Sequence, residues 1–562
     1  MSAIILGHVR SRRGARRALL MVVAVVGGGL LLGYAAFLRL TRIVPPALPA
    51  GASTSGELTV HGARVSFGAS WVSRERGIWE YHLSGEPFEM GLAHGRLGNR
   101  LLMETDDYMF AEFRRYVPSR LARFAIRLGV LFQHRHLTDH IPLRLQQEML
   151  GLSLGYIDRY EDFLPAYHRT VLYHALHDIT QTLERSPLIG CTAFAATRAA
   201  TLSGHLILGR NFDFEGPPIF DRDKAVLFFR PRGRIPFASV AWTGLMGVVT
   251  GLNAEGIFVS VNAARTQDRG QEGIPVELLL REVLERARSL QEAIDLLRQH
   301  PVLVPDLYLI GDGKTGEAVV VERSPTRLEV RRGGELLPLT NHGLSQPFVA
   351  DRENERLRRR TTSGARMARL EELLRQHRGA ISPAIAVDIL RDRKGAGGVP
   401  LGLGNRNAID ALIATHSVVA DATALILWVG AGPHASGRYI AFDLRRELRG
   451  EDRPHPMDLP EDPLLGSEEY RAWELAMQSL RAAEALRRAG ELDRAIEEAA
   501  RAEGLQPKMP EAHLLLGDLL RQRNDPRRGD AERWRHHYRR FLQEHPPYLD
   551  DVERVQQLLQ AR

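Results

Sequence analysis

The pattern of apolar and polar residues begins with a stretch that is entirely uncharged and mostly apolar, from Ala18 to Leu38. At a helical rise of about 1.5 Å per residue it is long enough to cross a hydrocarbon core of about 30 Å. Five arginines precede it and two follow it, a pattern typical of an anchor whose N-terminus lies in the cytoplasm. A cleaved signal peptide is the alternative, although the apolar core of such peptides is usually about 7 to 15 residues long. We expect residues 1–42 to form a basic tail and a transmembrane anchor, and residues 43–59 to form a spacer outside the cytoplasm.

After the spacer, the spacing of apolar residues along the chain changes. The stretches LARFAIRLGVLF and LRLQQEMLGLSLGYI repeat apolar residues every three or four positions, so we expect residues 60–190 to be a mainly helical fragment. The later stretches CTAFAAT and HLILGRNFDF are typical of strands, and Ser203-Gly204 between them indicates a tight turn. Residues 191–445 are therefore expected to form a core that contains β-sheet.

A third region follows Leu444. Charged residues and prolines in residues 446–469 indicate a linker, and residues 470–562 then show an alanine- and leucine-rich helical pattern. Its small residues resemble a tetratricopeptide pattern of about 34 residues per repeat. Only one and a half to two repeats fit, fewer than a freestanding array needs. We expect this region to pack on the rest of the chain or on a protein partner.

The distribution of charged residues along the chain indicates which kinds of molecule the protein can bind. The formal net charge is +7, and the seven arginines of residues 1–42 account for all of it, because the other 68 basic residues balance 68 acidic ones. No basic run interleaved with aromatic residues stands out. The sequence therefore argues against nucleic acid and predicts a membrane as the partner of the N-terminal segment.

The chain contains a single cysteine, Cys191, directly after Gly190. Exported domains usually use cysteines in pairs, so a lone thiol is either a small buried residue in a strand or a group kept free for chemistry. If the two expected strands form a hairpin, Arg210 and Asp213 on the second strand lie near Cys191 on the first. A thiol, a guanidinium and a carboxylate can then meet at one place.

Several motifs along the chain resemble those of one known family. The stretch Gly190-Cys191-Thr192, followed by Gly209 to Asp213, resembles the N-terminal-nucleophile (Ntn) hydrolases of the choloylglycine hydrolase and acyl-coenzyme A:6-aminopenicillanic acid acyltransferase group, also called C45 peptidase-like. The other similar segments are GEPFEMGLAHG (Gly85–Gly95), GLNAEGIFVSVN (Gly251–Asn262), LTNH (Leu339–His342), TTSGARMARLEELL (Thr361–Leu374) and the closing hairpin Ser417–Leu444. The resemblance spans roughly residues 60 to 445.

The resemblance implies an α+β fold, a four-layer αββα sandwich, in a chain that cuts itself between Gly190 and Cys191. The new α-amino group of Cys191, with an ordinary pKa of about 7.7 to 8.0, would then serve as general base beside the thiol nucleophile.

The family positions also imply roles for other residues. Asn341 and Asn262 would donate to the oxyanion, Arg210 would hold the thiolate or the acyl carbonyl, Asp213 would accept from the α-ammonium, and Arg366 would close the site electrostatically. The neighbouring arginines Arg358, Arg359, Arg360 and Arg369 are alternative matches for Arg366.

Other motifs have simpler interpretations. GDGKTGEAVVVE (Gly311–Glu322) contains Gly-Lys-Thr, but its glycine spacing does not fit a phosphate loop, and a hairpin turn at Asp312-Gly313 is expected instead. The histidines of QHRHLTDH (His134, His136 and His140) have no second ligand group at zinc-type spacing. A papain-like site needs a cysteine that opens a helix, whereas Cys191 opens a strand pattern. We expect no cofactor and no metal.

The sequence therefore predicts a membrane-anchored, extracytoplasmic, self-processing hydrolase or acyltransferase that acts on a linear amide through an acyl-Cys191 thioester. Hydrolysis and transfer to an amine are both compatible with these residues. The alternative from another class is a decayed hydrolase fold that serves as a tetratricopeptide-type interaction protein. No motif specifies the acyl group or the amine of the substrate.

Overall fold

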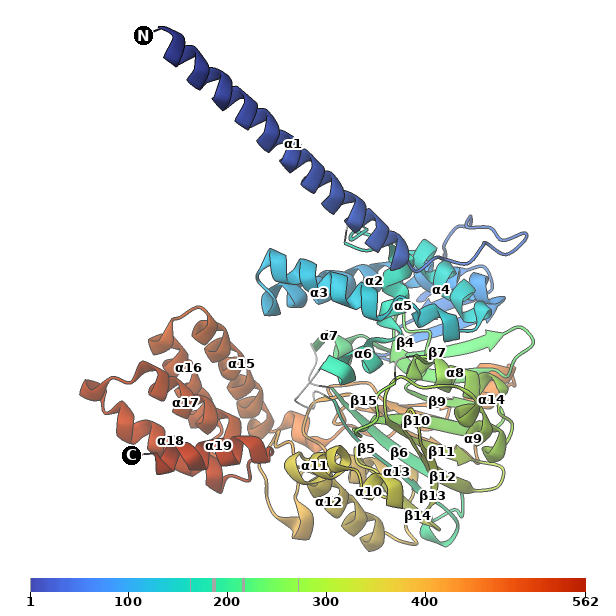
Figure 1. Cartoon of the computed structure of the whole chain (residues 1–562). Helices are drawn as coiled ribbons and strands as arrows, with labels where there is room; N and C mark the ends of the chain where they lie inside the picture. The colour runs from blue at the N-terminus through green and yellow to red at the C-terminus, as the bar shows by residue number, and fades with distance from the viewer. Residues whose placement is uncertain (1, 162, 184–188, 215–217, 271, 562) are drawn as a thin grey trace.

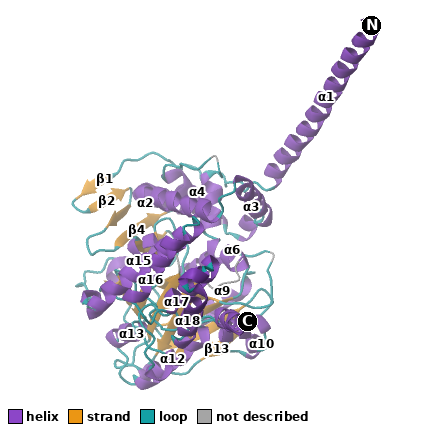
Figure 2. Ribbon diagram, turned by 90° about the vertical axis from the view of Figure 1, so that its left-hand side faces the viewer, coloured by secondary structure: helices purple, strands orange, loops and turns teal. Residues whose placement is uncertain are grey.

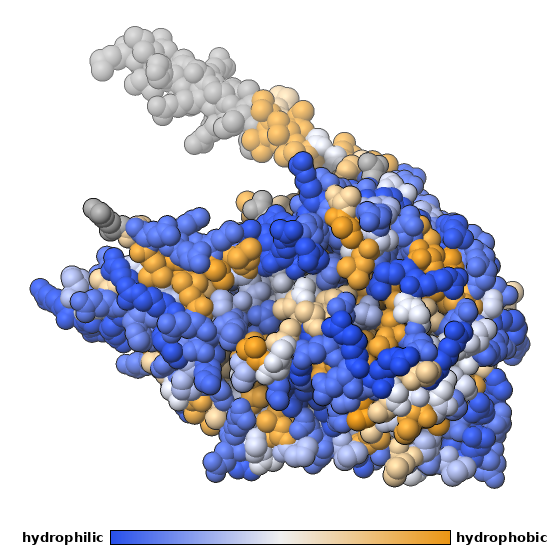
Figure 3. Space-filling view, turned by 90° about the horizontal axis from the view of Figure 1, so that it is seen from below, coloured by the Kyte–Doolittle hydropathy of each residue, from blue (hydrophilic) through white to orange (hydrophobic). Residues whose placement is uncertain are grey.

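The computed structural model of the chain describes residues 2–161, 163–183, 189–214, 218–270 and 272–561. Helix α1 (Ser2–Leu40) projects away from the body of the protein (Figure 1). Within the described residues, one helix is long and apolar enough to cross a membrane, Met21–Leu40, and none of it is buried. A signal sequence would meet the same criterion. In the space-filling view these apolar residues lie between the grey N-terminal part and the more hydrophilic body (Figure 3).

The region before Cys191 contains strands as well as the expected helices. The helices are α2 (Pro87–Tyr116), α3 (Arg120–Gln133), α4 (Leu143–Gly155), α5 (Ala166–Tyr173) and α6 (Leu176–Leu183), with a 3-10 turn at Leu137–His140. The strands are β1 (Thr59–His61), β2 (Arg64–Phe67), β3 (Ser70–Ser73) and β4 (Trp79–Gly85). The prediction of a mainly helical fragment is correct for its helices but missed these four strands, which are short and mixed in polarity.

Two sheets form the centre of the protein. The larger has eleven strands in the order β1-β2-β3-β4-β7-β8-β9-β10-β11-β12-β13, and the smaller has six in the order β14-β5-β6-β15-β16-β17. Among the described residues, neighbouring strands of the two sheets pair antiparallel except β4 with β7. The remaining strand bounds are β5 Ile189–Ala196, β6 Ile207–Phe214, β7 Lys224–Pro231, β8 Phe237–Trp242, β9 Thr250–Asn253, β10 Ile257–Ala263, β11 Asp306–Asp312, β12 Glu317–Arg323, β13 Leu328–Arg332, β14 Leu336–Leu339, β15 Ala414–Asp421, β16 Ile426–Gly430 and β17 Tyr439–Asp443.

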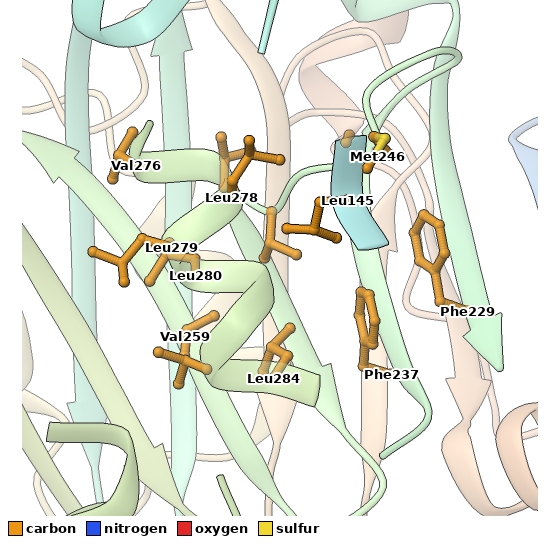
Figure 4. Close-up of a cluster of buried hydrophobic side chains, with 14 of the residues drawn as sticks. Leu145, Phe229, Phe237, Met246, Val259, Val276, Leu278, Leu279, Leu280 and Leu284 are labelled. Atoms are coloured by element: carbon orange, nitrogen blue, oxygen red, sulfur yellow. The ribbon is translucent and has the colours of Figure 1, made fainter. Parts of the chain in front are cut away.

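Three hydrophobic clusters show how the layers stack. One cluster lies between the sheets and joins Leu208 and Val418 of the smaller sheet to Phe228 and Leu309 of the larger. A second packs helices α8 (Val276–Arg286) and α9 (Leu290–Gln299) on the other face of the larger sheet (Figure 4). A third packs α12 (Ser363–Gln376) and α13 (Pro383–Leu390) on the outer face of the smaller sheet. The chain thus has a mixed α/β arrangement in which helices cover two facing sheets.

The two predicted turns have different outcomes. The expected tight turn at Ser203-Gly204 is wrong, because β5 and β6 are joined by a longer connection that contains a 3-10 turn at Arg198–Ala200. Gly204 nevertheless has the positive φ of +75° that favours glycine. The hairpin at Asp312-Gly313 is confirmed: β11 pairs with β12, and the Asp312 side chain accepts from the Lys314 backbone N–H at 2.9 Å.

The C-terminal region is helical, as expected, and contacts the rest of the chain. Its helices are α15 (Glu468–Arg488), α16 (Leu492–Leu505), α17 (Pro510–Arg523), α18 (Asp530–Gln543) and α19 (Leu549–Gln560), drawn in red beside the sheets in Figure 1 and nearer the viewer in Figure 2. Arg360, at the end of α11 (Arg352–Arg360), donates to Asp550 at 2.6 Å and to Glu553. Shorter helices α7 (Pro218–Arg222), α10 (Gln346–Val349) and α14 (Leu444–Arg449) connect the strands.

Candidate active site

Strand alternation places the candidate residues on two faces of the smaller sheet. Strands β5 and β6 pair so that Cys191 lies opposite Phe212, and Gly190 lies opposite Asp213. Directly opposed residues share a face and neighbours along a strand alternate, so the Cys191 thiol faces the larger sheet together with Phe212 and Arg210. Asp213 lies on the other face, beside Gly190 and under helix α12. Arg210 and Asp213 therefore approach Cys191 from two different faces of the sheet.

Arg210 links the thiol to the larger sheet. It is fully buried, and its Nη2 lies 3.7 Å from Cys191 Sγ. Its Nη1 donates to the Val249 carbonyl at 3.1 Å and also contacts the Thr250 hydroxyl, while Nη2 donates to the Val261 carbonyl. Three acceptors from β9, β10 and the chain before β9 thus fix the guanidinium beside the sulfur.

The protonation state of the thiol follows from these surroundings. Burial raises the pKa of Cys191 above its ordinary value, and the Arg210 charge partly opposes that rise. A hydrogen bond from the Asp213 backbone also acts to lower this pKa. Burial dominates, so the thiol is neutral at neutral pH in the uncut chain and needs a base or an activated neighbour before it can attack.

Asn341 and Arg366 hold the backbone of Cys191. The Asn341 side-chain oxygen accepts from the Cys191 backbone N–H at 2.9 Å and from Arg366 Nη2 at 2.7 Å. Arg366 Nη1 donates to the Cys191 carbonyl and, at 3.0 Å, to the Thr192 hydroxyl. Both side chains are buried. Arg366 therefore lies inside the site, under the nucleophile, rather than across its entrance.

The structure distinguishes Arg366 from its neighbouring arginines. Arg358 and Arg359 pair with Glu355, Arg360 pairs with Asp550, and Arg369 pairs with Asp392 at 2.7 Å. None of these four contacts Cys191 in the described part of the chain. The arginine that contacts Cys191 is thus Arg366.

Asn262 lies one step further from the nucleophile. Its Nδ2 donates to the Thr340 carbonyl at 2.7 Å, next to Asn341, and Asn341 Nδ2 donates to the Ala263 carbonyl at 2.9 Å. Each amide nitrogen carries two N–H groups, so each retains one for an acyl oxygen. The Oδ1 of Asn262 has no partner among the described residues.

Asp213 is a buried carboxyl with spare hydrogen-bonding capacity. Its Oδ1 has no partner within the described part of the chain. Burial raises the pKa of Asp213 to about 7, against the opposing charges of Arg366 and Arg406. A positive charge that appears on the neighbouring Cys191 nitrogen would stabilise the ionised form of this carboxyl.

Sequence reasoning missed several supporting residues. His416 lies 3.1 Å from Arg210 Nη1 and 3.0 Å from the Thr250 hydroxyl, and its ring stacks on Phe212. Burial and the Arg210 charge hold the pKa of His416 well below its ordinary value, so the ring is neutral. Ser363 supports the Thr-Asn-His segment by accepting from the Asn341 backbone N–H at 3.0 Å. His416 lies opposite Phe212 because β15 pairs with β6, a long-range pairing that no local sequence pattern indicates.

An apolar cavity of about 170 Å³ adjoins the site. It lies between helices of the region before Cys191 and strands β6 to β8, with Phe212 and Val249 in its wall. Most of the other walls are apolar, as at Leu102, Leu152 and Trp242. An apolar group bound there would lie next to the residues that contact Cys191.

Among the described residues, no group of three or more His, Cys, Asp or Glu side chains is arranged to hold a metal ion. Two of the histidines in QHRHLTDH have carboxylate neighbours instead. His136 lies 3.0 Å from Asp139, and His140 lies 3.4 Å from Glu272.

Comparison with known proteins gives a family match over part of the chain. Residues 200–397 match the family described as acyl-coenzyme A:6-aminopenicillanic acid acyl-transferase. The resemblance indicated by the sequence motifs is therefore confirmed for this segment.

The similar proteins cover only part of the chain. An uncharacterized protein of Archaeoglobus fulgidus is 26% identical over 272 residues, 45% of this chain and 45% of that protein. The N-acylethanolamine-hydrolyzing acid amidase of Mus musculus is 24% identical over 260 residues, 41% of this chain and 69% of that protein. The chain spans about half the length of the first relatives that it matches.

Solved structures give weaker matches. The Caenorhabditis elegans N-acylethanolamine-hydrolyzing acid amidase ortholog is 19% identical, with 42% of this chain and 93% of that chain covered and a TM-score of 0.31. Penicillin V acylase from Agrobacterium tumefaciens is 13% identical, with coverages of 46% and 89% and a TM-score of 0.32.

Proposed function

We propose that this protein is a self-processing Ntn amidohydrolase or acyltransferase that acts on linear amides of apolar acyl groups through an acyl-Cys191 thioester. The observation that carries this proposal is the set of contacts around one residue. The Cys191 nitrogen donates to Asn341, its carbonyl accepts from Arg366 and its sulfur lies beside Arg210. A structural cysteine in a strand has no need of three separate polar partners.

The first step is the cut itself. The Cys191 sulfur attacks the Gly190 carbonyl carbon, a C–S bond forms, the Gly190–Cys191 C–N bond breaks, and the thiol proton passes to the freed nitrogen. Water then hydrolyses the thioester, leaving a carboxylate on Gly190 and a free thiol and α-amine on Cys191. Gly190 has no Cβ, and one built there would lie 3.4 Å from Arg366 Nη2. The approach to this bond is therefore less hindered than beside a larger residue.

The second step repeats this chemistry on a substrate. The α-amine takes the thiol proton, the thiolate attacks the amide carbonyl, and the proton moves on to the leaving amine. The free N–H groups of Asn341 and Asn262 would receive the oxyanion, and Asp213 would hold the protonated α-amine. Water or an acceptor amine then cleaves the thioester, which gives hydrolysis or transfer.

The substrate class follows from the cavity beside Phe212. Its mostly apolar walls fit an aliphatic acyl chain. The similarity to the mouse N-acylethanolamine-hydrolyzing acid amidase supports an amide of that kind. We further propose that α1 anchors the protein in a membrane with the hydrolase region outside the cytoplasm, and that the C-terminal helices form a tetratricopeptide-like unit, available to a protein partner.

Mass spectrometry of the trapped acyl-enzyme tests the proposal. Detergent-purified protein is mixed with N-acyl amides of chains from about four to sixteen carbons, acidified within seconds and digested. The expected result is an acyl group on the Cys191 peptide, together with release of the amine. Cys191→Ala should give neither product. Amine release that persists in Cys191→Ala would overturn the thioester mechanism.

A further inference from the structure

Glu277 is a polar residue in the apolar cavity that the mechanism above does not use. It is the second residue of α8, it lines the cavity beside Val249, and its side chain is 94% buried, since its exposed fraction is 6%. Its Oε2 has no hydrogen-bond partner among the described residues. A buried polar atom of this kind calls for an explanation.

Several other polar groups in the cavity wall already have partners. Asp106 accepts from the Tyr173 hydroxyl at 2.8 Å and from Tyr156 at 3.2 Å. His174 contacts the Thr170 carbonyl and the Met246 backbone N–H at 2.7 and 3.0 Å. Glu277, in contrast, has a buried side-chain oxygen with no partner among the described residues.

The backbone of Glu277 lies close to the residues that hold Arg210. Its carbonyl accepts from the Val248 N–H at 2.8 Å. The carbonyl of the following residue, Val249, accepts from Arg210, whose other nitrogen lies 3.7 Å from the Cys191 sulfur. Glu277 is thus connected to Cys191 through residues 248–249 and the side chain of Arg210.

The charges around Glu277 favour its neutral form. Burial and the nearby Asp178 carboxyl raise the pKa of Glu277 well above its ordinary value. His177, a histidine in the cavity wall, is engaged with Asp306 at 3.1 Å and with Gln181. A neutral carboxylic acid has one O–H to donate, and Glu277 Oε2 has no partner within the described part of the chain.

We propose that Glu277 donates a hydrogen bond to a hydroxyl or keto oxygen on the acyl chain of the substrate, close to the reacting carbonyl. The enzyme then prefers acyl amides that carry such an oxygen over plain alkyl amides of the same length. A plain alkyl chain leaves the buried Glu277 O–H without an acceptor, and this lowers kcat/KM for that substrate. The apolar walls of the cavity accept the rest of either acyl chain. This inference rests on the proposed function, because it assigns the acyl group to this cavity.

Matched substrates test the preference. Decanoyl amides of one fluorogenic amine are compared with and without a hydroxyl or keto group at the third carbon. We expect kcat/KM of the wild-type protein to be at least about tenfold higher for the oxygen-bearing chains. Glu277→Gln should keep most of that ratio, because its amide still donates. Glu277→Met should bring the ratio close to one by slowing the oxygen-bearing substrates. Glu272→Met, at an exposed carboxylate in the preceding loop, is the matched control and should retain the wild-type ratio.

The pH dependence gives a second readout that does not depend on the Met variant folding. The wild-type ratio should fall as pH rises and the Glu277 carboxyl ionises, whereas Glu277→Gln should hold its ratio. Asp178, His177 and Asp306, the titratable groups around Glu277, are common to both proteins and cancel in the comparison. Equal rates for plain and oxygen-bearing chains in the wild type would overturn the inference while leaving the thioester mechanism intact. A higher rate for chains with an amino group would also overturn it, since Glu277 would then act as an anion. If neither chain acylates Cys191, the proposed function itself fails.

Discussion

The Asn341 side-chain oxygen lies 2.9 Å from the Cys191 backbone nitrogen, the atom that would become the α-amine in the proposed cut. The same oxygen accepts from Arg366. The nitrogen therefore has a side-chain acceptor in place in the uncut chain.

We expect purified protein to separate under denaturing conditions into two pieces, residues 1–190 and 191–562, the larger starting Cys-Thr-Ala-Phe. Cys191→Ala has no sulfur to start the acyl shift and should remain one chain. Cys191→Ser should be cut slowly, because an unactivated hydroxyl is the weaker nucleophile. N-terminal sequencing and intact mass are the measurements. An active wild-type protein that stays in one piece would contradict the mechanism, and a cut that persists in Cys191→Ala would point to an outside protease.

Asp213→Asn should lower the turnover of processed protein. Loss of a charge-assisted hydrogen bond to the α-ammonium removes about 1.5 to 3 kcal/mol, which corresponds to a loss in kcat of about 10- to 150-fold. The measurement is kcat at pH 7 on protein whose cut has been verified by mass. Asp392→Asn, which alters an ion pair with Arg369 away from Cys191, is the control. Turnover equal to wild type would make Asp213 a structural residue.

The buried carboxyl of Asp178 should make the uncut protein less stable as pH rises. Burial raises the pKa of Asp178 from 3.8 to about 7, so between these values the folded form holds a proton that the unfolded form has lost. The free energy of unfolding contributed by this group falls through that window, by up to about 1.4 kcal/mol per pH unit. Denaturant unfolding of Cys191→Ala and of Cys191→Ala/Asp178→Asn from pH 4 to pH 8 measures the effect.

The free energy of unfolding of Cys191→Ala/Asp178→Asn should fall less over this pH range than that of Cys191→Ala. Asn still offers an oxygen to the Val276 N–H, which Asp178 accepts at 3.2 Å. Histidines with lowered pKa, such as His94 and His174, act in the opposite direction, but they are present in both proteins. If the free energy of unfolding changes with pH equally in the two proteins, Asp178 is ionised in the folded chain.

Fusion reporters test the direction of the anchor. A reporter that fluoresces only in the cytoplasm should be dark when fused after Arg562, because the arginines before Ala18 favour a cytoplasmic N-terminus. An alkaline phosphatase fusion at the same position should be active. Replacing the five arginines before Ala18 by glutamine should weaken this bias. A bright cytoplasmic reporter on the unaltered chain would contradict the topology.

Local patterns in the sequence pointed to Cys191 and to the residues that contact it. Cys191, Arg210 and Asn341 each stand in a short motif, and the structure brings these motifs together. Thr250 and His416 could not be found in this way, because they reach the site only through pairing between distant strands. The sequence was sufficient to predict that Arg210 and Asp213 lie on opposite faces of their strand. Side chains alternate between the two faces along a strand, and three positions separate these residues. Strands β1 to β3 escaped detection because they have only three or four residues each.

Strand β4 pairs in parallel with β7, from Trp79 opposite Ala225 to Gly85 opposite Pro231. The connection between these two strands contains the Gly190–Cys191 bond, so the proposed cut would turn one chain into a heterodimer with a fixed ratio of one to one. A parallel pair needs a long crossover to form, and the cut removes the tether that kept both ends at high effective concentration. The sheet is therefore built once, before the cut, and mixing the two separated pieces would not readily rebuild it. On this scheme, a cut chain identifies a molecule that had folded before it was cut.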